Sequence, residues 1–375
     1  MGIFIGHEAL NAFEPTAYTI EHSFLSYALQ DGEPIARNVM TAHGALVLKD
    51  AVFPVTTNDY ERDNCYVVSP YAAYVDYARD ELESWKSNVP KWPFNLLIGL
   101  VTPILRLARV DDAAHINNWL LSTNLYPQWD AENLNELTSD LITRFPDKFI
   151  YFRSLNQFSN ETLMNRFVEA GYRLLPARQV YIFDVPPSGW DQKTNTRRDL
   201  RLIEKTKLAF VGHNEFGDND FDRIRELYDA LYLKKYTPLN PQFTSTFLRW
   251  AHSKEVFHFE GYRDASGVLV AVVGTFALGG SITAPIVGYD TEQPQSLGLY
   301  RMLMALVFKR AIAVGAPLNL SAGAASFKRL RGGVPYIEYS AVYDRHLQPH
   351  RRLVVSTLRA LLNGFGVPIM RRYEL

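Results

Sequence analysis

The chain's clearest chemical feature is a run of small residues followed by clustered positive charge, in the segment LNLSAGAASFKRLRGG at 318–333. Small side chains leave room for a ligand, and the cations that follow can stabilise negative charge. Lys328 can hydrogen-bond an oxyanion or neutralise a phosphate. Arg329 and Arg331 are permanently charged and suit the phosphate role only. A solvated basic turn is the alternative interpretation.

A second feature is the segment QSLGLYR at 295–301, which precedes a long apolar helix predicted up to Gly315. The first backbone N–H groups of a helix have no partner within the helix and can face an anionic or carbonyl group. An ordinary helix start, with glycine in the turn, is the alternative. The residues predicted to contact a ligand here are Gln295, Ser296, Gly298 and Arg301.

The elements that must position these residues alternate between helices and strands, which predicts an α/β (α+β) fold. Prolines and glycine in the segment VPPSG at 185–189 interrupt regular structure. We therefore predict an N-terminal domain at 1–188 and a C-terminal domain at 189–375 that ends in a helical tail. The first contains a strand–helix–strand unit. The second reads as two helices, a three-stranded meander, a long helix and two strands.

Composition excludes several classes of protein. The 375 residues suit two domains, and 39 basic against 40 acidic residues argue against a protein bound permanently to nucleic acid. Cys65 is the only cysteine, which excludes an intramolecular disulfide and a cysteine-based metal site. The histidines lack metal-ligand spacing, and no glycine-rich nucleotide loop occurs. We expect no metal and no tightly bound cofactor.

No targeting signal is recognisable at the N-terminus, so a reducing cytoplasm is the expected location. The most apolar run, FNLLIGLVTPIL at 94–105, is too short to span a bilayer and contains Pro103. We predict that it is a buried core segment and that the chain has no membrane span. The oligomeric state stays open.

Residues 218–345 resemble the GNAT superfamily, in the branch of the Fem-type aminoacyltransferases and the acetyltransferase-6 (BioF2-like) proteins. The resemblance rests on VGYDTEQPQSLGLYRMLMALVFKRAIAVGAPLNLSAG and ASFKRLRGG. It implies tandem GNAT-like domains, each a mixed, mostly antiparallel sheet flanked by helices. It also implies that 295–298 binds the donor, although Tyr300 stands where the usual signature has a second small residue.

The activity implied by the resemblance is transfer of an acyl or aminoacyl group to an amine, with acyl-CoA or aminoacyl-tRNA as co-substrate. Lys328 would then stabilise the tetrahedral intermediate, and Arg329 and Arg331 would bind the donor. A base must also deprotonate the amine. Asp290, Glu338 and Tyr343 are the candidates, and capping the turn before the helix is the alternative role of Asp290.

Two further segments are candidates for binding a small-molecule or peptide amine. LYLKKYTPLNPQFT at 231–244 contains Lys235, Tyr236 and Asn240. The alternative is that Lys234, Lys235 and Tyr236 are ordinary surface residues. NNWLLSTNLYPQW at 117–129 contains Asn118 and Asn124 and is predicted to line a cleft facing the second domain. A catalytically inactive GNAT-fold scaffold is the alternative to a biosynthetic enzyme. DNA is not an expected partner, whereas a charged tRNA is.

Overall fold

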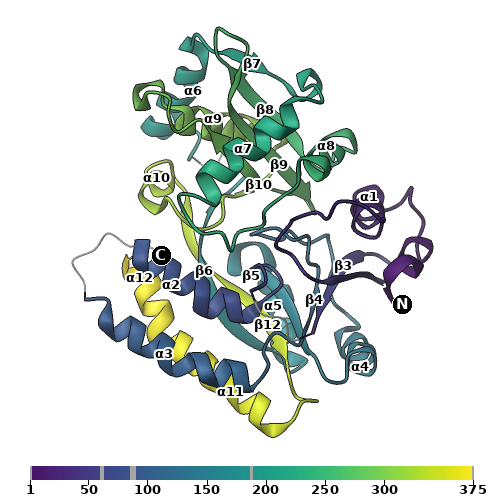
Figure 1. Cartoon of the computed structure of the whole chain (residues 1–375). Helices are drawn as coiled ribbons and strands as arrows, with labels where there is room; N and C mark the ends of the chain where they lie inside the picture. The colour runs from purple at the N-terminus through teal and green to yellow at the C-terminus, as the bar shows by residue number, and fades with distance from the viewer. Residues whose placement is uncertain (1, 60–62, 85–89, 186–188, 374–375) are drawn as a thin grey trace.

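The computed structural model of the protein describes residues 2–59, 63–84, 90–185 and 189–373. Its twelve described strands join in one mixed sheet with helices on both faces (Figure 1). Most neighbouring strands are antiparallel, and the predicted α/β (α+β) class is confirmed. The predicted boundary at 188/189 falls at residues 186–188, outside the described ranges.

The first half of the chain builds one end of the sheet. Its strands are β1 (Gly2–Ile5), β2 (Ala42–Val47), β3 (Val52–Asn58), β4 (Ala113–Ile116), β5 (Phe149–Asn156) and β6 (Arg173–Phe183). Its helices are η1 (Gly6–Asn11), α1 (Thr19–Ala28), η2 (Ala72–Asp76), α2 (Tyr77–Ser84), α3 (Trp92–Leu107), α4 (Leu134–Arg144) and α5 (Gln157–Glu169).

The second half follows the predicted order of elements. Its strands are β7 (Ala209–Val211), β8 (His258–Arg263), β9 (Leu269–Leu278), β10 (Ser281–Tyr289), β11 (Leu318–Asn319) and β12 (Val334–Tyr343). Its helices are α6 (Thr194–Lys205), η3 (His213–Glu215), α7 (Asp220–Tyr232), α8 (Ser245–Ser253), η4 (Gln295–Leu297), α9 (Leu299–Val314) and α10 (Ala325–Arg329). A helical tail comprises α11 (Pro349–Leu361), η5 (Leu362–Gly366) and α12 (Val367–Tyr373), as predicted.

The strand order is symmetric and identifies a tandem repeat. The sheet runs β1-β2-β3-β4-β5-β12-β6-β11-β10-β9-β8-β7, and adding six to each strand of the first half gives the matching strand of the second. Each half contributes its last strand to the other. β12 lies between β5 and β6, while β6 lies between β12 and β11. The predicted tandem repeat is therefore observed, but its two halves share one sheet, whereas a separate sheet was predicted for each domain.

Each half contains one parallel strand pair, and the two pairs occupy matching positions. β4 pairs with β5 as far as Ile116–Phe152, and β10 pairs with β11 as far as Thr283–Asn319. Two residues beyond the last pair, Ser154 has φ 65° and Ser321 has φ 59°. This left-handed backbone is unusual for serine, so the chain turns in the same way where each parallel pair ends.

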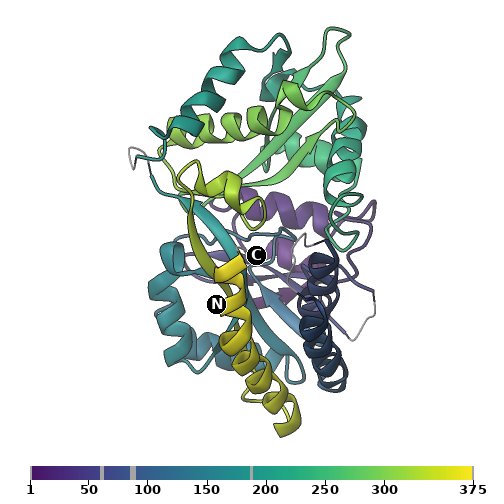
Figure 2. The same ribbon diagram turned by 90° about the vertical axis from the view of Figure 1, so that its left-hand side faces the viewer.

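Alternation along β5 directs its side chains to opposite faces of the sheet. Ile150 and Phe152 join the core under α4 and α5, whereas Phe149 and Tyr151 join the core under α3 and α11. Figure 2 shows α2 and α3 on one side of α11 and α12, with the sheet behind them.

The apolar helix α3 corrects one prediction. The segment 94–105 was expected to be buried core, but within α3 only Leu105 is buried. Trp92 is 69% exposed and Leu107 is 73% exposed. The prediction was wrong because α3 lies at the edge of the molecule and presents apolar residues to solvent as well as to the interior.

By length and composition alone, one helix in the described ranges could cross a membrane. It is the continuous segment Pro349–Tyr373, and 28% of its most apolar window is buried. In the structure this segment packs against β6 and α3.

Candidate functional site

Two cavities lie on opposite faces of the sheet around β5. One, here called the polar cavity, has a volume of about 410 Å³ and opens between the two halves of the chain. The other, here called the apolar cavity, has a volume of about 280 Å³ and lies between the α2–α3 and α11–α12 helices. Ser154 lines both cavities.

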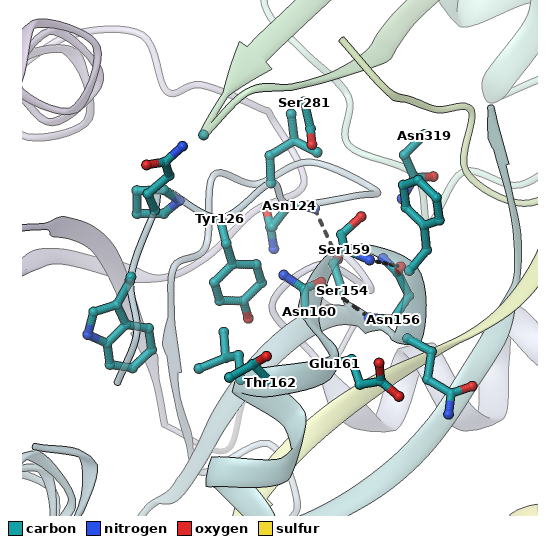
Figure 3. A pocket seen from close by; sticks show the side chains of 18 residues that line it. Asn124, Tyr126, Ser154, Asn156, Ser159, Asn160, Glu161, Thr162, Ser281 and Asn319 are labelled. Atoms are coloured by element: carbon teal, nitrogen blue, oxygen red, sulfur yellow. Dashed lines mark hydrogen bonds between the residues drawn. The ribbon is translucent and has the colours of Figure 1, made fainter. Parts of the chain in front are cut away.

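Amides and hydroxyls form the wall of the polar cavity (Figure 3). The first half contributes the segment 124–129, the end of β5 and the start of α5, whose cap is Asn156 accepting from the Ser159 N–H at 2.9 Å. The second half contributes Gly279, Ser281 and Asn319. Among the described residues that line the cavity there is one carboxylate, Glu161, and no lysine, arginine or histidine.

Asn124 places a buried side-chain amide in the wall of the polar cavity. It is 1% exposed, its Oδ1 accepts from the Trp119 N–H at 3.1 Å, and its own N–H donates to Ser154 Oγ at 3.0 Å. Its Nδ2 has no hydrogen-bond acceptor within the described ranges. A buried amide without a partner is costly, so a ligand or water oxygen would be bound favourably there.

The turn between β9 and β10 closes the polar cavity and supplies a testable contact. Gly279 and Gly280 both have positive φ, 56° and 80°. A Cβ on Gly279 would lie 2.0 Å from the Tyr126 carbonyl oxygen, whereas one on Gly280 would meet nothing within 4 Å. We expect Gly280→Ala to cost about 1–2 kcal/mol from backbone strain alone. Gly279→Ala should cost a further ~1–3 kcal/mol from the clash. Urea denaturation measures both, and equal losses would contradict this packing.

Aliphatic side chains of α3 and the C-terminal tail and aromatic side chains, among them Tyr74, Tyr77 and Phe94, form the walls of the apolar cavity, while its floor on the sheet is charged. Arg178 on β6 donates to Glu338 on β12 (Nε to Oε1, 2.9 Å) and to Thr123 Oγ1 at 2.9 Å. Glu338 is 3% exposed. Burial disfavours the charged form of Arg178, but the Glu338 carboxylate outweighs this effect and raises the pKa of Arg178.

Arg153 on β5 adds a second cation to this floor. Its Nη1 donates to the Val67 carbonyl at 2.9 Å and to Asn118 Oδ1 at 3.2 Å. Burial lowers the pKa of Arg153. No carboxylate in the described part of the chain forms an ion pair with it, so this guanidinium can bind an anionic or carbonyl oxygen of a ligand.

A histidine on β4 provides an uncharged polar group beside these cations. His115 is 2% exposed and stacks on Tyr151, with ring centroids 5.1 Å apart. Burial, and then the charge of Arg153, lower the pKa of His115 to about 3, so its ring is neutral at physiological pH. Within the described ranges its Nδ1 has no hydrogen-bond partner.

Glu81 on α2 lines the apolar cavity from the helical side. Its side chain is accessible from the cavity but surrounded by protein, and this enclosure raises the pKa of Glu81 to about 7, against the opposing charge of Arg178. A carboxyl group with a pKa near neutrality is suited to accept a proton at physiological pH.

A β-bulge lies in β5 at the residue that lines both cavities. Phe152 pairs with Ala341 and Leu155 with Tyr339, so Arg153 and Ser154 together face the single residue Ser340. Arg153 continues the alternation of Tyr151 and lines the apolar cavity, while the Ser154 hydroxyl accepts from the Asn124 N–H in the polar-cavity wall. Bulges often serve to re-aim side chains near active sites.

Of the predicted site residues, the structure places two in these cavities. Glu338 lies on the floor of the apolar cavity and Asn124 lines the polar cavity, which faces the second half as predicted for the segment 117–129. Asn118 is fully buried beneath Arg153, with Nδ2 donating to Thr56 Oγ1 and the Val67 carbonyl. Its contacts fit a supporting role.

Lys328 is engaged within the protein. Its Nζ donates to the carbonyls of Leu320, Ser321 and Ala322 at 2.7, 3.2 and 2.8 Å, which occupies all three ammonium hydrogens. Burial, and then the charge of Arg178, lower the pKa of Lys328 to about 7, while the three carbonyls favour its ammonium form. These contacts fit a clamp on the loop after β11 better than a free oxyanion donor.

The predicted donor-binding arginines meet on a buried carboxylate. Asp199 on α6 is completely buried and accepts from Arg301 Nε at 2.7 Å and from Arg331 Nε at 2.5 Å. Arg331 also lies over the Phe327 ring, 3.3 Å from its centroid. Arg329 is exposed. The cluster at 328–331 therefore ties α6, α9 and α10 together.

The remaining predicted residues lie outside both cavities. Gln295 and Ser296 are exposed in η4, and Gly298 forms the N-cap of α9 with φ 67°. Asp290 pairs with Arg223 at 3.1 Å and accepts from the Glu292 N–H at 3.0 Å, which is the turn-capping alternative.

The other three assignments fit packing or surface positions. Tyr343 packs on Tyr172. Asn240 Nδ2 donates to the carbonyls of Tyr232 and Thr237. Lys235 and Tyr236 are exposed.

Five residues that line the apolar cavity were not among the predicted site residues: Arg153, Arg178, His115, Glu81 and Ser154. One signal was available. Arg153 interrupts the apolar strand FIYFRSLN, and Arg178 interrupts RLLPARQVYIF, so each places a charge within a strand of a central sheet. A charge in such a position requires a partner or a function.

No protein-family model matches the chain, and no curated protein sequence matches it. Several solved structures resemble this chain in fold. FemX covers 92% of this chain and 98% of its own, with 8% identity and a TM-score of 0.48. A tandem GNAT protein from the clavulanic acid biosynthesis pathway covers 91% and 98%, with 8% identity and a TM-score of 0.40. L-PGS from Bacillus licheniformis covers 60% and 76%, with 18% identity and a TM-score of 0.42. Since these TM-scores are below 0.5, the fold assignment rests on the strand order and pairing.

Proposed function

We propose that this protein is an acyltransferase that joins an activated acyl group to an amine at the junction of the two cavities. The observation that carries the proposal is that Ser154 lines both a polar cavity on one face of the sheet and an apolar cavity on the other. Two substrates held in separate cavities and meeting at one point would react with the entropic advantage of a single complex.

The chemistry of each lining suggests which substrate it would hold. The polar cavity offers amide and hydroxyl groups and the Glu161 carboxylate, which suit an amine in its cationic or neutral form. The apolar cavity offers aliphatic walls and the Arg153 guanidinium. Arg153 would hydrogen-bond the acyl oxygen and stabilise its negative charge in the tetrahedral intermediate.

In the reaction, the amine nitrogen attacks the acyl carbonyl carbon and the C–N bond forms. The bond from that carbon to the sulfur or oxygen of the donor breaks, and the departing atom takes a proton. Glu81, which lines the apolar cavity, would remove the proton that makes the ammonium form unreactive once the amine has reached the acyl carbonyl beside Arg153. The donor remains acyl-CoA or aminoacyl-tRNA, and a cytoplasmic enzyme without a tightly bound cofactor remains the expectation.

The test incubates purified protein with acyl-CoA or charged tRNA donors and a panel of amines. Mass spectrometry then measures the amide product. Since Glu81 must lose its proton and its pKa is about 7, the rate should rise about tenfold per pH unit below pH 7 and level off above it. Glu81→Gln should lower turnover by about 10²–10⁴ and remove this acid limb.

Glu83→Gln is the matched control, because Glu83 lies on the same helix but lines neither cavity. It should behave as the parent. If Glu81→Gln kept turnover within about threefold and kept the acid limb, Glu81 would not be the base. No product from any donor, together with no donor binding, would favour the inactive scaffold.

A further inference from the structure

We propose that the apolar cavity binds one long aliphatic acyl chain, which enters between the α2–α3 and α11–α12 helices and places its carbonyl or carboxylate oxygens at Arg153. The statement that this acyl chain is the transferred group rests on the proposed function. The statement that the cavity binds the acyl chain rests only on the residues of its walls and floor.

The walls favour an extended hydrocarbon. Leu97, Ile98 and Val101 of α3 face Leu361 and Ile369 of the C-terminal tail across the cavity, and all five belong to its lining. The volume of about 280 Å³ is close to the lower end of small-molecule pockets, roughly 300–1,000 Å³. Such a space suits a single chain.

The floor favours an oxygen-bearing head group at the end of that chain. Arg153 lines the cavity and makes no ion pair with a carboxylate among the described residues. His115 lines the same floor and is 2% exposed. Its Nδ1 has no hydrogen-bond partner in the described ranges. A cation and an unpartnered polar nitrogen beneath aliphatic walls match a chain that ends in a carbonyl or carboxylate group.

The helices on both sides of the cavity also expose apolar side chains. On α3, Leu96 and Leu100 are 57% and 60% exposed, and on the C-terminal tail Leu353 and Phe365 are 66% and 58% exposed. Figure 2 shows both helical pairs at the same face of the molecule. A chain can therefore arrive either from a soluble acyl carrier or from a lipid bilayer.

The first test measures displacement of a fluorescent fatty acid by unlabelled saturated fatty acids of increasing length. Affinity should rise by up to about fourfold per added CH₂ until the cavity is filled. Arg153→Met should weaken fatty-acid binding by about 10–100-fold and leave binding of the alcohol of the same chain length within about twofold. No binding at any chain length would overturn the proposal.

Variants that fill the cavity locate the bound chain. Val101→Trp should reduce binding at least tenfold, whereas Leu100→Trp, one residue away and facing solvent, should stay within about twofold. Leu361→Trp and Leu353→Trp repeat this comparison on the opposite wall. Thermal unfolding identifies the folded variants, and unchanged binding in a folded Val101→Trp or Leu361→Trp protein would overturn the proposal.

Flotation with phosphatidylglycerol vesicles distinguishes the two sources of the chain. If the parent protein floats with the vesicles and Val101→Trp does not, the acyl chain belongs to a bilayer lipid. If the parent protein binds fatty acids but does not float, the acyl chain comes from a soluble donor. Both results support the cavity. If Val101→Trp and Leu361→Trp both still float with the vesicles and no fatty acid binds, the protein attaches to the bilayer only through its surface. That result would overturn the proposed acyl-chain site. Fatty-acid binding without amide formation would refute the proposed function alone.

Discussion

Replacing Glu338 by alanine should lower the free energy of unfolding by about 3–5 kcal/mol, because it leaves the Arg178 guanidinium buried without its counter-ion. The pair is short, 2.9 Å between Arg178 Nε and Glu338 Oε1, and the two side chains are 19% and 4% exposed. Urea denaturation measures the loss. The pair also joins β12 from the second half to β6 from the first, so the loss should include their packing.

An exposed ion pair provides the control. Arg249 and Asp218 lie 3.7 Å apart with side chains 44% and 85% exposed, and Asp218→Ala should change stability by less than about 1 kcal/mol. A double variant, Arg178→Met with Glu338→Leu, should recover much of the stability because it removes both buried charges. A loss below about 1 kcal/mol for Glu338→Ala would contradict the buried pair.

Lys328→Met should destabilise the fold by about 3 kcal/mol or more, since three carbonyls would lose their charged donor at once. Those carbonyls belong to the loop at 320–322, where Ser321 adopts a left-handed backbone. Methionine keeps the length and apolar stem of the side chain, so the loss reports on the hydrogen bonds. Denaturation of both proteins in parallel measures it.

Lys309→Met is the matched control, because Lys309 is exposed on α9 and should change stability by no more than about 0.5 kcal/mol. The same variant tests the role predicted from sequence. If Lys328 were an oxyanion donor, Lys328→Met would fold with parental stability and lose about 10²–10³ in turnover. Parental stability with lost turnover would therefore restore the catalytic assignment.

Elements with a local pattern could be predicted from the sequence. Helix α7 follows from apolar residues at spacings of three and four, and Phe221, Ile224 and Leu227 on that face are buried. Gly315 ends α9 with φ 67°, and Gly279-Gly280 forms the β9–β10 turn. Each signal lies within a few residues of the structure it specifies, so no knowledge of distant contacts was needed.

The order of elements also determined that the chain contains a repeat, because the second half shows two helices, a meander, a long helix and two strands. It did not determine how the halves join. The exchange of β6 and β12 depends on pairing between residues such as Arg178 and Glu338, which are 160 positions apart. Each residue stands out as a charge within an apolar strand, but nothing in either strand identifies the residue that it pairs with.

The tertiary structure therefore decided which charged residues form the site. In sequence, the cluster at 328–331 looked available to a ligand, but folding brings Asp199 to Arg331 and three carbonyls to Lys328. Arg153, an isolated charge in an apolar strand, instead reaches a cavity without a carboxylate partner among the described residues. A charge is available to a ligand only when distant residues do not satisfy it, and the sequence alone specifies the charge but not those neighbours.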